Sequence, residues 1–139
     1  MIRDIRNLFD TLEAYEIYAD CMYMPTFEKF HARAVEYIKN DAIHIYGYYE
    51  SSRLTGIIVL EKQSDEQAEI KGIAVNADYR KRGVGEKLIH YSCNELAISV
   101  LTAETDDDAV GFYMRCGFVA KGFMKYGEYK RYNCTLTIT

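Results

Sequence analysis

The sequence predicts an α/β protein with a mixed, mostly antiparallel sheet and helices on both faces of that sheet. Three strand-like runs within residues 42–75 are joined by short polar turns, which is typical of an antiparallel meander. Residues 85–116 then alternate helix, strand and helix, and two more strand-like runs follow at 118–138. Hydrophobic residues make up 49% of the chain, enough for a packed core, and the length predicts one domain over residues 1–139.

The N-terminal part predicts one strand and two helices. Residues 2–6 read as a short strand, and residues 7–22 have helical spacing. One face of that first helix would carry Leu8, Leu12, Tyr15 and Ala19. Pro25 interrupts the chain, and Thr26 is placed to cap a second helix. The apolar stripe of the second helix would comprise Phe27, Phe30, Ala34 and Tyr37 or Ile38.

The remaining elements complete the order β-α-α-β-β-β-α-β-α-β-β. The meander strands are 42–50, 54–62 and 68–75. A helix beginning at Gly85 would bury Ile89, Cys93, Leu96 and Ala97, and a strand follows at 99–103. Thr105 is placed to cap the next helix, and Gly117 to end it. That helix would bury Ala109, Phe112, Tyr113 and Cys116. The last two strands would flank residues 125–130.

Composition and charge argue against several classes of protein. The formal net charge of −4 does not favour nucleic acid as a partner. The longest purely aliphatic run, residues 57–60, is too short to cross a membrane, and the charged N-terminus MIRDIRNLFD has no apolar signal region. The four cysteines and three histidines lack metal-ligand spacing, so we expect no metal site and a reducing, cytoplasmic location.

A basic turn with two glycines precedes the helix that begins at Gly85. Glycines let a ligand approach the backbone closely, and the first N–H groups of a helix have no partners. Together with the helix dipole and the charges of Arg80, Lys81 and Arg82, the turn predicts a site for an anion such as a diphosphate. It matches neither G-x-G-x-x-G nor a P-loop, because a third glycine and G-K-[S/T] are both missing. A solvated corner is the alternative interpretation.

Two segments together resemble the GNAT superfamily of acyl-CoA-dependent N-acetyltransferases. IAVNADYRKRGVGEKLI is similar to the family motif in which a strand and a loop lead to R/Q-x-x-G-x-G/A at a helix start, matched here by residues 80–85. DDDAVGFYMRCGF is similar to N-x-x-A-x-x-F-Y-x-x-x-G-F, with Asp106 in place of the commoner asparagine. The resemblance covers residues 54–119 well, and the order of elements agrees over nearly the whole chain.

The resemblance implies a central splayed sheet and acetyl-CoA as co-substrate. The pyrophosphate of the coenzyme would lie on the basic turn, and its pantetheine arm would pair with the preceding strand, in a gap between that strand and residues 99–103. Gly72 is placed for a bulge that begins the separation. The positions implied to bind the coenzyme are Ile73, Ala74, Val75, Arg80, Lys81, Arg82, Gly83, Val84, Gly85, Asp106, Ala109, Phe112 and Tyr113.

The resemblance also implies direct acetyl transfer to a primary amine, without a covalent enzyme intermediate. Tyr113 matches the common general acid of the family, whose hydroxyl bonds the coenzyme sulfur. Glu69 lies where several members carry a glutamate base. Because an ordinary glutamate has a pKa of about 4.3, it would need desolvation or a bridging water chain, and an exposed strand glutamate is the alternative. A backbone N–H within residues 73–75 would meet the oxyanion.

The resemblance does not define the acceptor, which is expected to be a small-molecule amine or a peptide. The segments that would choose it, residues 8–50 and 120–132, carry no recognisable motif. A group of tyrosines at the N-terminal helices, Tyr15, Tyr18 and Tyr23, either binds an amine or forms one helix face. Late strands mediate dimers in many relatives, which allows a homodimer. Two other classes stay open: an acyl-CoA sensor without turnover, and an interaction domain, which explains neither glycine motif.

Overall fold

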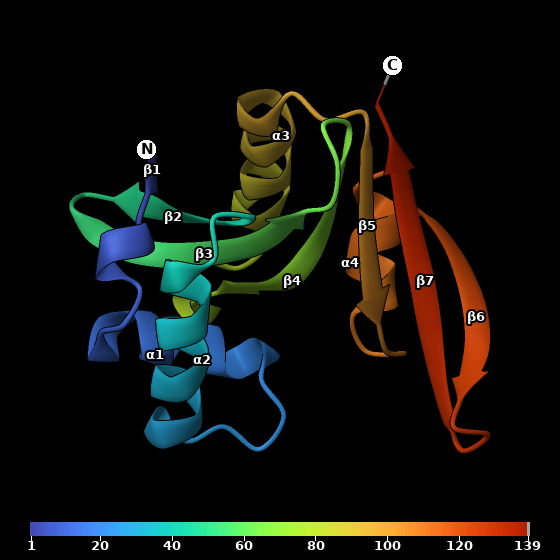
Figure 1. Cartoon of the computed structure of the whole chain (residues 1–139), viewed down its shortest axis with the longest axis horizontal. Coiled ribbons are helices and arrows are strands. Elements are labelled where there is room, and N and C mark those ends of the chain that lie inside the picture. Colours follow the sequence, from blue (N-terminus) through green and yellow to red (C-terminus); the bar gives the residue numbers. More distant parts are fainter. Residues whose placement is uncertain (139) are drawn as a thin grey trace.

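A seven-stranded mixed sheet organises the part of the chain that this computed structural model describes, residues 1–138. The spatial order of the strands is β1-β2-β3-β4-β5-β7-β6, and only β4 and β5 run parallel (Figure 1). The strands are β1 Ile2–Asp4, β2 Ile43–Glu50, β3 Arg53–Lys62, β4 Gln67–Val75, β5 Val100–Thr105, β6 Val119–Lys125 and β7 Tyr129–Thr137. The helices are η1 Arg6–Leu8, α1 Leu12–Tyr18, η2 Ala19–Cys21, α2 Phe27–Lys39, η3 Ala77–Tyr79, α3 Val84–Leu96 and α4 Val110–Arg115. The predicted fold class and order of elements are confirmed.

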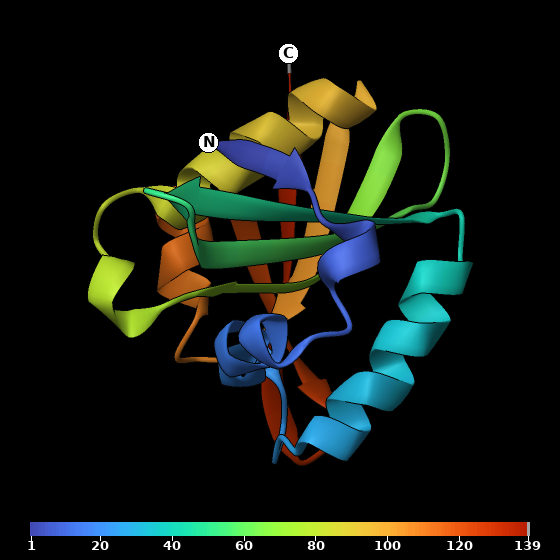
Figure 2. The same cartoon turned by 90° about the vertical axis from the view of Figure 1, so that its left-hand side faces the viewer.

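The sheet buries a separate hydrophobic core on each face. One core lies beneath α3 and α4 and includes Ile58, Leu60, Leu88, Leu101 and Tyr113. The other lies beneath α1 and α2 and includes Phe9, Phe30, Ile45, Ile57 and Ala74. In Figure 2, α3 lies above strands β1–β4, and α1 and α2 lie below them. Because side chains alternate along a strand, β3 serves both cores and is almost completely buried.

The single N-terminal helix predicted over residues 7–22 is wrong. The side chain of Thr11 accepts a hydrogen bond from Ala14 N at 3.2 Å, so α1 begins only at Leu12 and is flanked by 3₁₀ turns. This new start rotates the buried face to Ala14, Ile17 and Tyr18. Leu8 and Leu12, which were expected in the core, are 56% and 60% exposed. The predicted face assumed one continuous helix, whereas Thr11 separates two.

The cap predicted at Thr105 is also wrong. β5 pairs with β7 through Thr105 and Tyr132, so Thr105 remains in the strand and is buried. Asp106 instead caps the turn that leads into α4, because its Oδ1 accepts hydrogen bonds from Asp108 N at 3.1 Å and Ala109 N at 3.0 Å.

The prediction for Gly117 at the end of α4 is confirmed, and the prediction for Ala97 at the end of α3 is wrong. The end of α4 at Gly117 is confirmed by a left-handed φ of 97° and a Phe118 N to Tyr113 O bond of 3.0 Å. Ala97, in contrast, is not on the buried face of α3. It is exposed and forms the left-handed C-cap of that helix.

Strands β4 and β5 separate soon after they meet. Their parallel pairing covers only Gln67–Glu69 against Val100–Thr102, and beyond it β4 stays paired with β3 alone and β5 with β7 alone (Figure 1). A bulge lies at this point, because Val59 pairs with Gly72 while Leu60 pairs with Ile70, which leaves Lys71 as the extra residue. The predicted bulge beside Gly72 is therefore present.

Gly72 has a second function in the fold. A Cβ at this position would lie 2.1 Å from the hydroxyl of Tyr18, so only glycine lets the α1 tyrosine rest against β4. Tyr18 is 1% exposed and is one of the largest side chains in its core. The bulge and the close approach of α1 together fix where the gap between β4 and β5 opens.

Candidate active site

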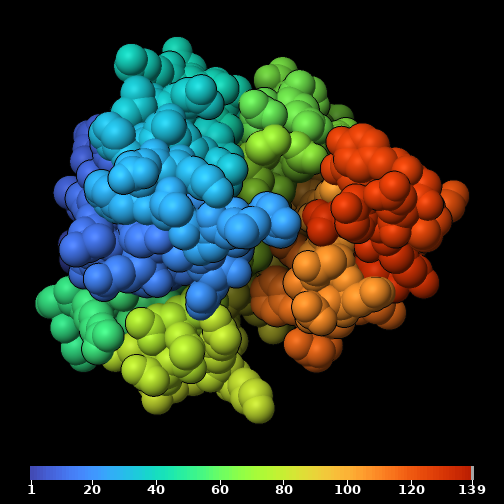
Figure 3. Space-filling model, turned by 90° about the horizontal axis from the view of Figure 1, so that it is seen from below, coloured from blue at the N-terminus to red at the C-terminus, as the bar shows by residue number. Residues whose placement is uncertain are grey.

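The separation of β4 and β5 produces a furrow across the molecule. Figure 3 shows it as a hollow between the N-terminal segments in blue and the C-terminal segments in orange and red. A small pocket lies where the two strands part, lined by Glu69 and Lys71 of β4, Glu104 of β5 and Arg131 of β7. The furrow thus lies between two halves of the chain that are joined by the short β4–β5 pairing.

The β4 backbone along this gap has a free edge. Ile73, Ala74 and Val75 pair with β3 on one side, and β5 has already diverged on the other. Their peptide groups on that second side have no strand partner among the described residues, as an extended ligand arm requires. Ala74 packs its side chain into the core beneath α1 and α2, whereas Ile73 and Val75 pack against the opposite core.

The basic turn ends at the N-terminus of α3, beside the same gap. The first backbone bond into the helix runs from Lys87 N to Gly83 O at 2.9 Å, so the N–H groups of residues 84–86 precede it and point out of the helix end. Val84 and Gly85 are buried there, and Gly83 is exposed. These free donors and the positive end of the helix dipole suit an anionic ligand.

The three basic residues of the turn have different partners. Arg80 forms an ion pair with Asp20 of η2, and its Nε–H donates a hydrogen bond of 3.0 Å to Val75 O. Arg82 lies over the ring of Tyr79, 5.1 Å from its centroid, and 3.5 Å from a carboxylate oxygen of Glu50. Lys81 is exposed and has no ion-pair partner within residues 1–138. Lys81 is therefore the side chain of the turn that is immediately available to an anion.

The two glycine positions of the turn require glycine for different structural reasons. Gly83 has a left-handed φ of 77°, and a Cβ there would meet nothing within 4 Å, so the position needs glycine for its backbone and borders open space. At Gly85 a Cβ would lie 2.8 Å from Cζ of Phe112. Gly85 thus lets α4 pack on the start of α3, and it joins the two sequence motifs physically.

Tyr113 lies in the core on the α3 and α4 face and is 6% exposed. Its ring makes edge contacts with Phe112 and Phe118, each with centroids 5.2 Å apart. Burial raises its pKa well above the ordinary value, and the thiols of Cys21 and Cys134 add to this effect. The hydroxyl therefore stays protonated at every physiological pH, and it is available only as a hydrogen-bond donor or a neutral acceptor.

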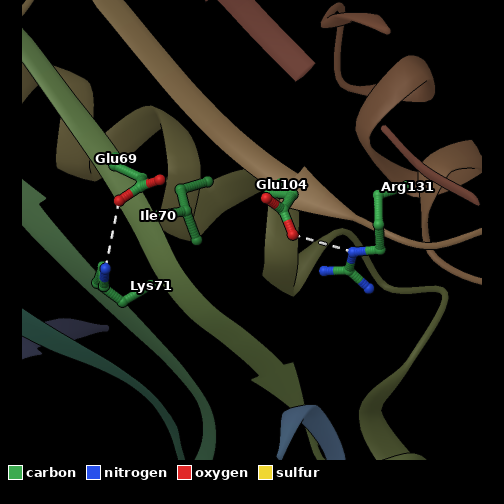
Figure 4. A pocket seen from close by; sticks show the side chains of 5 residues that line it. All are labelled: Glu69, Ile70, Lys71, Glu104 and Arg131. Atoms are coloured by element: carbon green, nitrogen blue, oxygen red, sulfur yellow. Dashed lines mark hydrogen bonds and ion pairs between the residues drawn. The ribbon is translucent and has the colours of Figure 1, made fainter. Parts of the chain in front are cut away.

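Glu69 faces the other side of the sheet, at the last position of β4 that pairs with β5. Its Oε1 lies 3.3 Å from Nζ of Lys71, and its side chain is 32% exposed. Burial alone would lower the pKa of Lys71, but the carboxylates of Glu69 and Glu61 raise it, so the ammonium stays charged. The carboxylate of Glu69 consequently has one oxygen held by Lys71 and one that is free for another partner (Figure 4).

Several residues at the pocket were not identified from sequence. Glu104 accepts hydrogen bonds from Lys125 Nζ and Arg131 Nε, both at 3.0 Å. These residues belong to three different strands, and their sequence spacing carries no motif, so only the register of β5, β6 and β7 brings them together. The tyrosine group expected at the N-terminal helices does not form one face, because Tyr18 is buried and Tyr23 is 87% exposed.

Two further findings concern the described part of the chain. Nowhere in residues 1–138 do three His, Cys, Asp or Glu side chains gather closely enough to hold a metal ion. Among the helices of that same part, none combines the length and the apolar character needed to cross a membrane. The fold and the site together define an α/β protein whose sheet opens beside a basic helix N-terminus.

Comparison with known proteins identifies the family. The sequence model of the acetyltransferase (GNAT) family matches residues 11–118, well over half of the chain. The chain belongs to this family, which confirms the resemblance and the enzyme class predicted from sequence. No protein of curated function matches the chain.

Solved structures share the fold over most or all of the chain. The ribosomal-protein-S18-alanine N-acetyltransferase of Escherichia coli is 18% identical with a TM-score of 0.76, covering 100% of this chain and 94% of its own. A GNAT family acetyltransferase of Elizabethkingia anophelis with acetyl-CoA bound is 18% identical with a TM-score of 0.71, covering 99% and 97%. A Bacillus anthracis protein assigned as a streptothricin acetyltransferase, in complex with acetyl coenzyme A, is 29% identical with a TM-score of 0.65, covering 76% and 68%.

Proposed function

We propose that the protein transfers an acetyl group from acetyl-CoA directly to a primary amine. The observation that carries this proposal is the position of the α3 N-terminus beside the free edge of β4. A diphosphate on the helix end and an extended arm along residues 73–75 would place a thioester in the gap between β4 and β5. Structural neighbours that contain acetyl-CoA support the choice of coenzyme.

The coenzyme site in this proposal combines the positions predicted from sequence. The N–H groups of residues 84–86 and the side chain of Lys81 receive the diphosphate, and Gly83 leaves the space for it. Arg80 contributes in a different way, because its pairing with Asp20 and Val75 O ties the turn to η2 and to the end of β4. Phe112 acts through its packing on Gly85. Asp106 and Ala109 act through the capped turn that positions α4.

The reaction requires a neutral amine, a stabilised oxyanion and a leaving thiolate. Glu69 is the proposed acceptor of the first proton, directly or through water, because its free oxygen faces the gap (Figure 4). The amine nitrogen then attacks the thioester carbonyl, and a backbone N–H of residues 73–75 donates to the oxyanion. Collapse breaks the carbon–sulfur bond and releases the thiolate of coenzyme A.

Tyr113 is proposed to assist that departure as a hydrogen-bond donor. A thiol has an ordinary pKa of about 8.5 and a phenol of about 10, and burial raises the pKa of Tyr113 further. Complete proton transfer from this phenol to the thiolate is therefore uphill. The protonated nitrogen of the tetrahedral intermediate is the more acidic donor, so it supplies the proton while Tyr113 stabilises the developing negative charge on sulfur.

The experiment that tests this proposal measures release of free coenzyme A from acetyl-CoA with a panel of amines and peptides. We expect release that depends on one class of amine, with the N-acetylated product in equal amount. Binding of acetyl-CoA without release for any acceptor would instead support a sensor of acyl-CoA. The ion pair of Glu69 with Lys71 is the observation that favours this second candidate, because it leaves the proposed base only half free.

The proposed setting is the cytoplasm, where acetyl-CoA and reduced thiols coexist. Cys21, Cys93, Cys116 and Cys134 are all free, as is usual in a reducing compartment. Burial raises the pKa of Cys93 and Cys116, which disfavours the thiolate form that a cysteine nucleophile needs. This agrees with direct transfer to the amine, without an acetylated cysteine as an intermediate.

A further inference from the structure

The pocket at the branch of β4 and β5 has a composition that restricts the acceptor. Its volume is about 230 Å³, and its charged lining residues are Glu69, Lys71, Glu104 and Arg131 (Figure 4). On β5, Leu101 and Ala103 belong to the core beneath α3 and α4, so Glu104 lies on the opposite face, with α1 and α2. The pocket therefore opens on the face away from Tyr113, where an acceptor would approach a coenzyme held in the gap.

The charges of this pocket balance. Two carboxylates and two cations line it, so its formal net charge is zero, and each carboxylate already has a cationic partner. Lys125 adds a second cation on Glu104, at 3.0 Å from its Oε2. A polycationic acceptor would find no unpaired negative charge here. An acceptor with one positive and one negative group would match the lining on both sides.

Arg131 offers a specific position for the negative group. Its Nε donates to Glu104 at 3.0 Å, while its two terminal nitrogens have no hydrogen-bond partner within residues 1–138. In Figure 4 the dashed line from Glu104 reaches only Nε, and neither terminal nitrogen is joined to another of the residues drawn. A guanidinium that is fixed at Nε presents its terminal pair as a planar fork, which binds a carboxylate through two parallel hydrogen bonds. The Arg131 side chain is only 30% exposed, so such bonds would form in a partly desolvated place.

We infer that the acceptor is a small zwitterion, an amine that also carries a carboxylate, as free amino acids do. This inference rests on the proposed acetyl transfer and adds the substrate class. The carboxylate binds the fork of Arg131, and the ammonium group lies near the free oxygen of Glu69 across the pocket (Figure 4). Glu69 receives one proton, the nitrogen forms a bond to the acetyl carbon, and coenzyme A leaves as the thiol. The product is an N-acetylamino acid.

The size of the pocket agrees with a small acceptor. Sites for drug-sized ligands usually enclose about 300–1,000 Å³, and this pocket is smaller. A longer peptide would place a neutral peptide bond at the position of the carboxylate and would leave the Arg131 fork without an anion. Free amino acids should therefore be better acceptors than peptides that begin with the same residue.

Matched acceptors test this inference directly. Each amino acid of a panel is compared with its carboxamide and with a dipeptide of the same first residue, by coenzyme A release. We expect kcat/KM for the best amino acid to exceed that of its carboxamide by about tenfold or more, the usual effect of one charged hydrogen-bond pair. In Arg131→Gln, the ratio of kcat/KM for the amino acid to kcat/KM for its carboxamide should fall to within about twofold of unity. Arg131→Lys should retain part of it, because the charge remains and the fork is lost.

Lys130→Gln is the matched control, because Lys130 is the neighbouring cation on β7 and lies over the ring of Tyr132 instead of lining the pocket. It should leave the ratio unchanged. The inference alone is overturned if carboxamides or dipeptides are acetylated as well as the free acids, or if Arg131→Gln keeps the preference. If no amine of any kind is acetylated, the proposed function itself fails, and this inference fails with it.

Discussion

Tyr113 is the single residue on which the proposed chemistry depends most. Removal of its hydroxyl in Tyr113→Phe should lower kcat by about 10- to 100-fold, the usual effect of losing one hydrogen bond to a charged group. The Kd for acetyl-CoA should change by less than about threefold, because the ring and its contacts with Phe112 and Phe118 remain. Steady-state kinetics and calorimetry measure the two quantities.

The control for this variant is Tyr46→Phe. Tyr46 is also buried and makes a T-shaped contact with Tyr91, with ring centroids 5.1 Å apart, but it lies away from the gap. It should leave kcat unchanged. Equal losses of kcat and coenzyme affinity in Tyr113→Phe would assign Tyr113 a packing role instead. Because burial raises the pKa of Tyr113, activity should also show no loss through ionisation of this phenol between pH 7 and about 9.

The two glycines of the turn should respond differently to alanine. Gly85→Ala forces a Cβ against the ring of Phe112 and should cost about 1–3 kcal/mol in the free energy of unfolding. The double variant with Phe112→Leu should recover part of that loss. Gly83→Ala should cost about 1–2 kcal/mol through its left-handed backbone, and Phe112→Leu should recover none of it. Urea denaturation of the single and double variants gives the coupling energy of each glycine position with Phe112. Equal coupling energies at both positions would contradict the conclusion that only Gly85 packs on Phe112.

Glu104 should make stability depend on pH in the acid range. Burial alone would raise its pKa, but hydrogen bonds from Lys125 and Arg131 lower it below the ordinary value. A carboxyl whose folded pKa is depressed stabilises the protein above its unfolded pKa, about 4.3, and this contribution is lost as the pH falls through the folded pKa. The advantage of wild type over Glu104→Gln in Tm should therefore shrink below about pH 4. A constant difference from pH 7 to pH 3 would show that the ion pairs contribute nothing.

At the scale of elements, the turn into α4 depends on Asp106. Asp106→Ala removes the acceptor of two backbone N–H groups and should destabilise the protein by about 1 kcal/mol. Asp106→Asn keeps the cap and should change the free energy of unfolding by only a few tenths of a kcal/mol. Since this variant also removes a negative charge beside the proposed coenzyme site, acetyl-CoA should bind more tightly, and more so at low salt. Unchanged affinity at all salt concentrations would place Asp106 outside the field of the coenzyme.

The long, strongly patterned elements could be predicted from the sequence, and the short ones could not. The meander strands and α3 were identified because their apolar residues follow one period over many positions. The first helix was misjudged because Thr11 restarts it after a 3₁₀ turn, and nothing in the apolar spacing marks that restart. The cap at Thr105 was misplaced because pairing with β7 extends β5, which depends on residues about 30 positions later.

The candidate site also contains residues that could be predicted from the sequence and residues that could not. Positions 80–85 and 106–118 lie in continuous segments, so a motif could reveal them. Glu104, Lys125 and Arg131 come from three strands and are assembled only by register, so no local pattern reports the pocket that they form. The sequence also could not show that Arg80 is paired with Asp20, an interaction between residues 60 positions apart.

At the scale of the molecule, the gap between β4 and β5 joins two halves that share only a short strand pairing. A coenzyme in the gap would contact both halves, so acetyl-CoA at 100 times its Kd should stabilise the fold by about 2.7 kcal/mol. Amide hydrogen exchange should slow at residues 73–75 and 84–86, and it should remain unchanged on the β1–β2 pair, which lies far from the gap (Figure 1). Protection confined to other regions would contradict the proposed binding mode.

The most direct test of the central claim is a product assay with acetyl-CoA and a mixed panel of amines, amino acids and peptides. Free coenzyme A and N-acetylated product are quantified together by mass spectrometry. Our proposal predicts equal amounts of both with one acceptor class, and strong loss of both in Gly83→Glu, which places bulk and negative charge in the space left for the diphosphate. Folded protein that binds acetyl-CoA but yields no acetylated product with any acceptor would contradict the claim that this gap is a site of acetyl transfer.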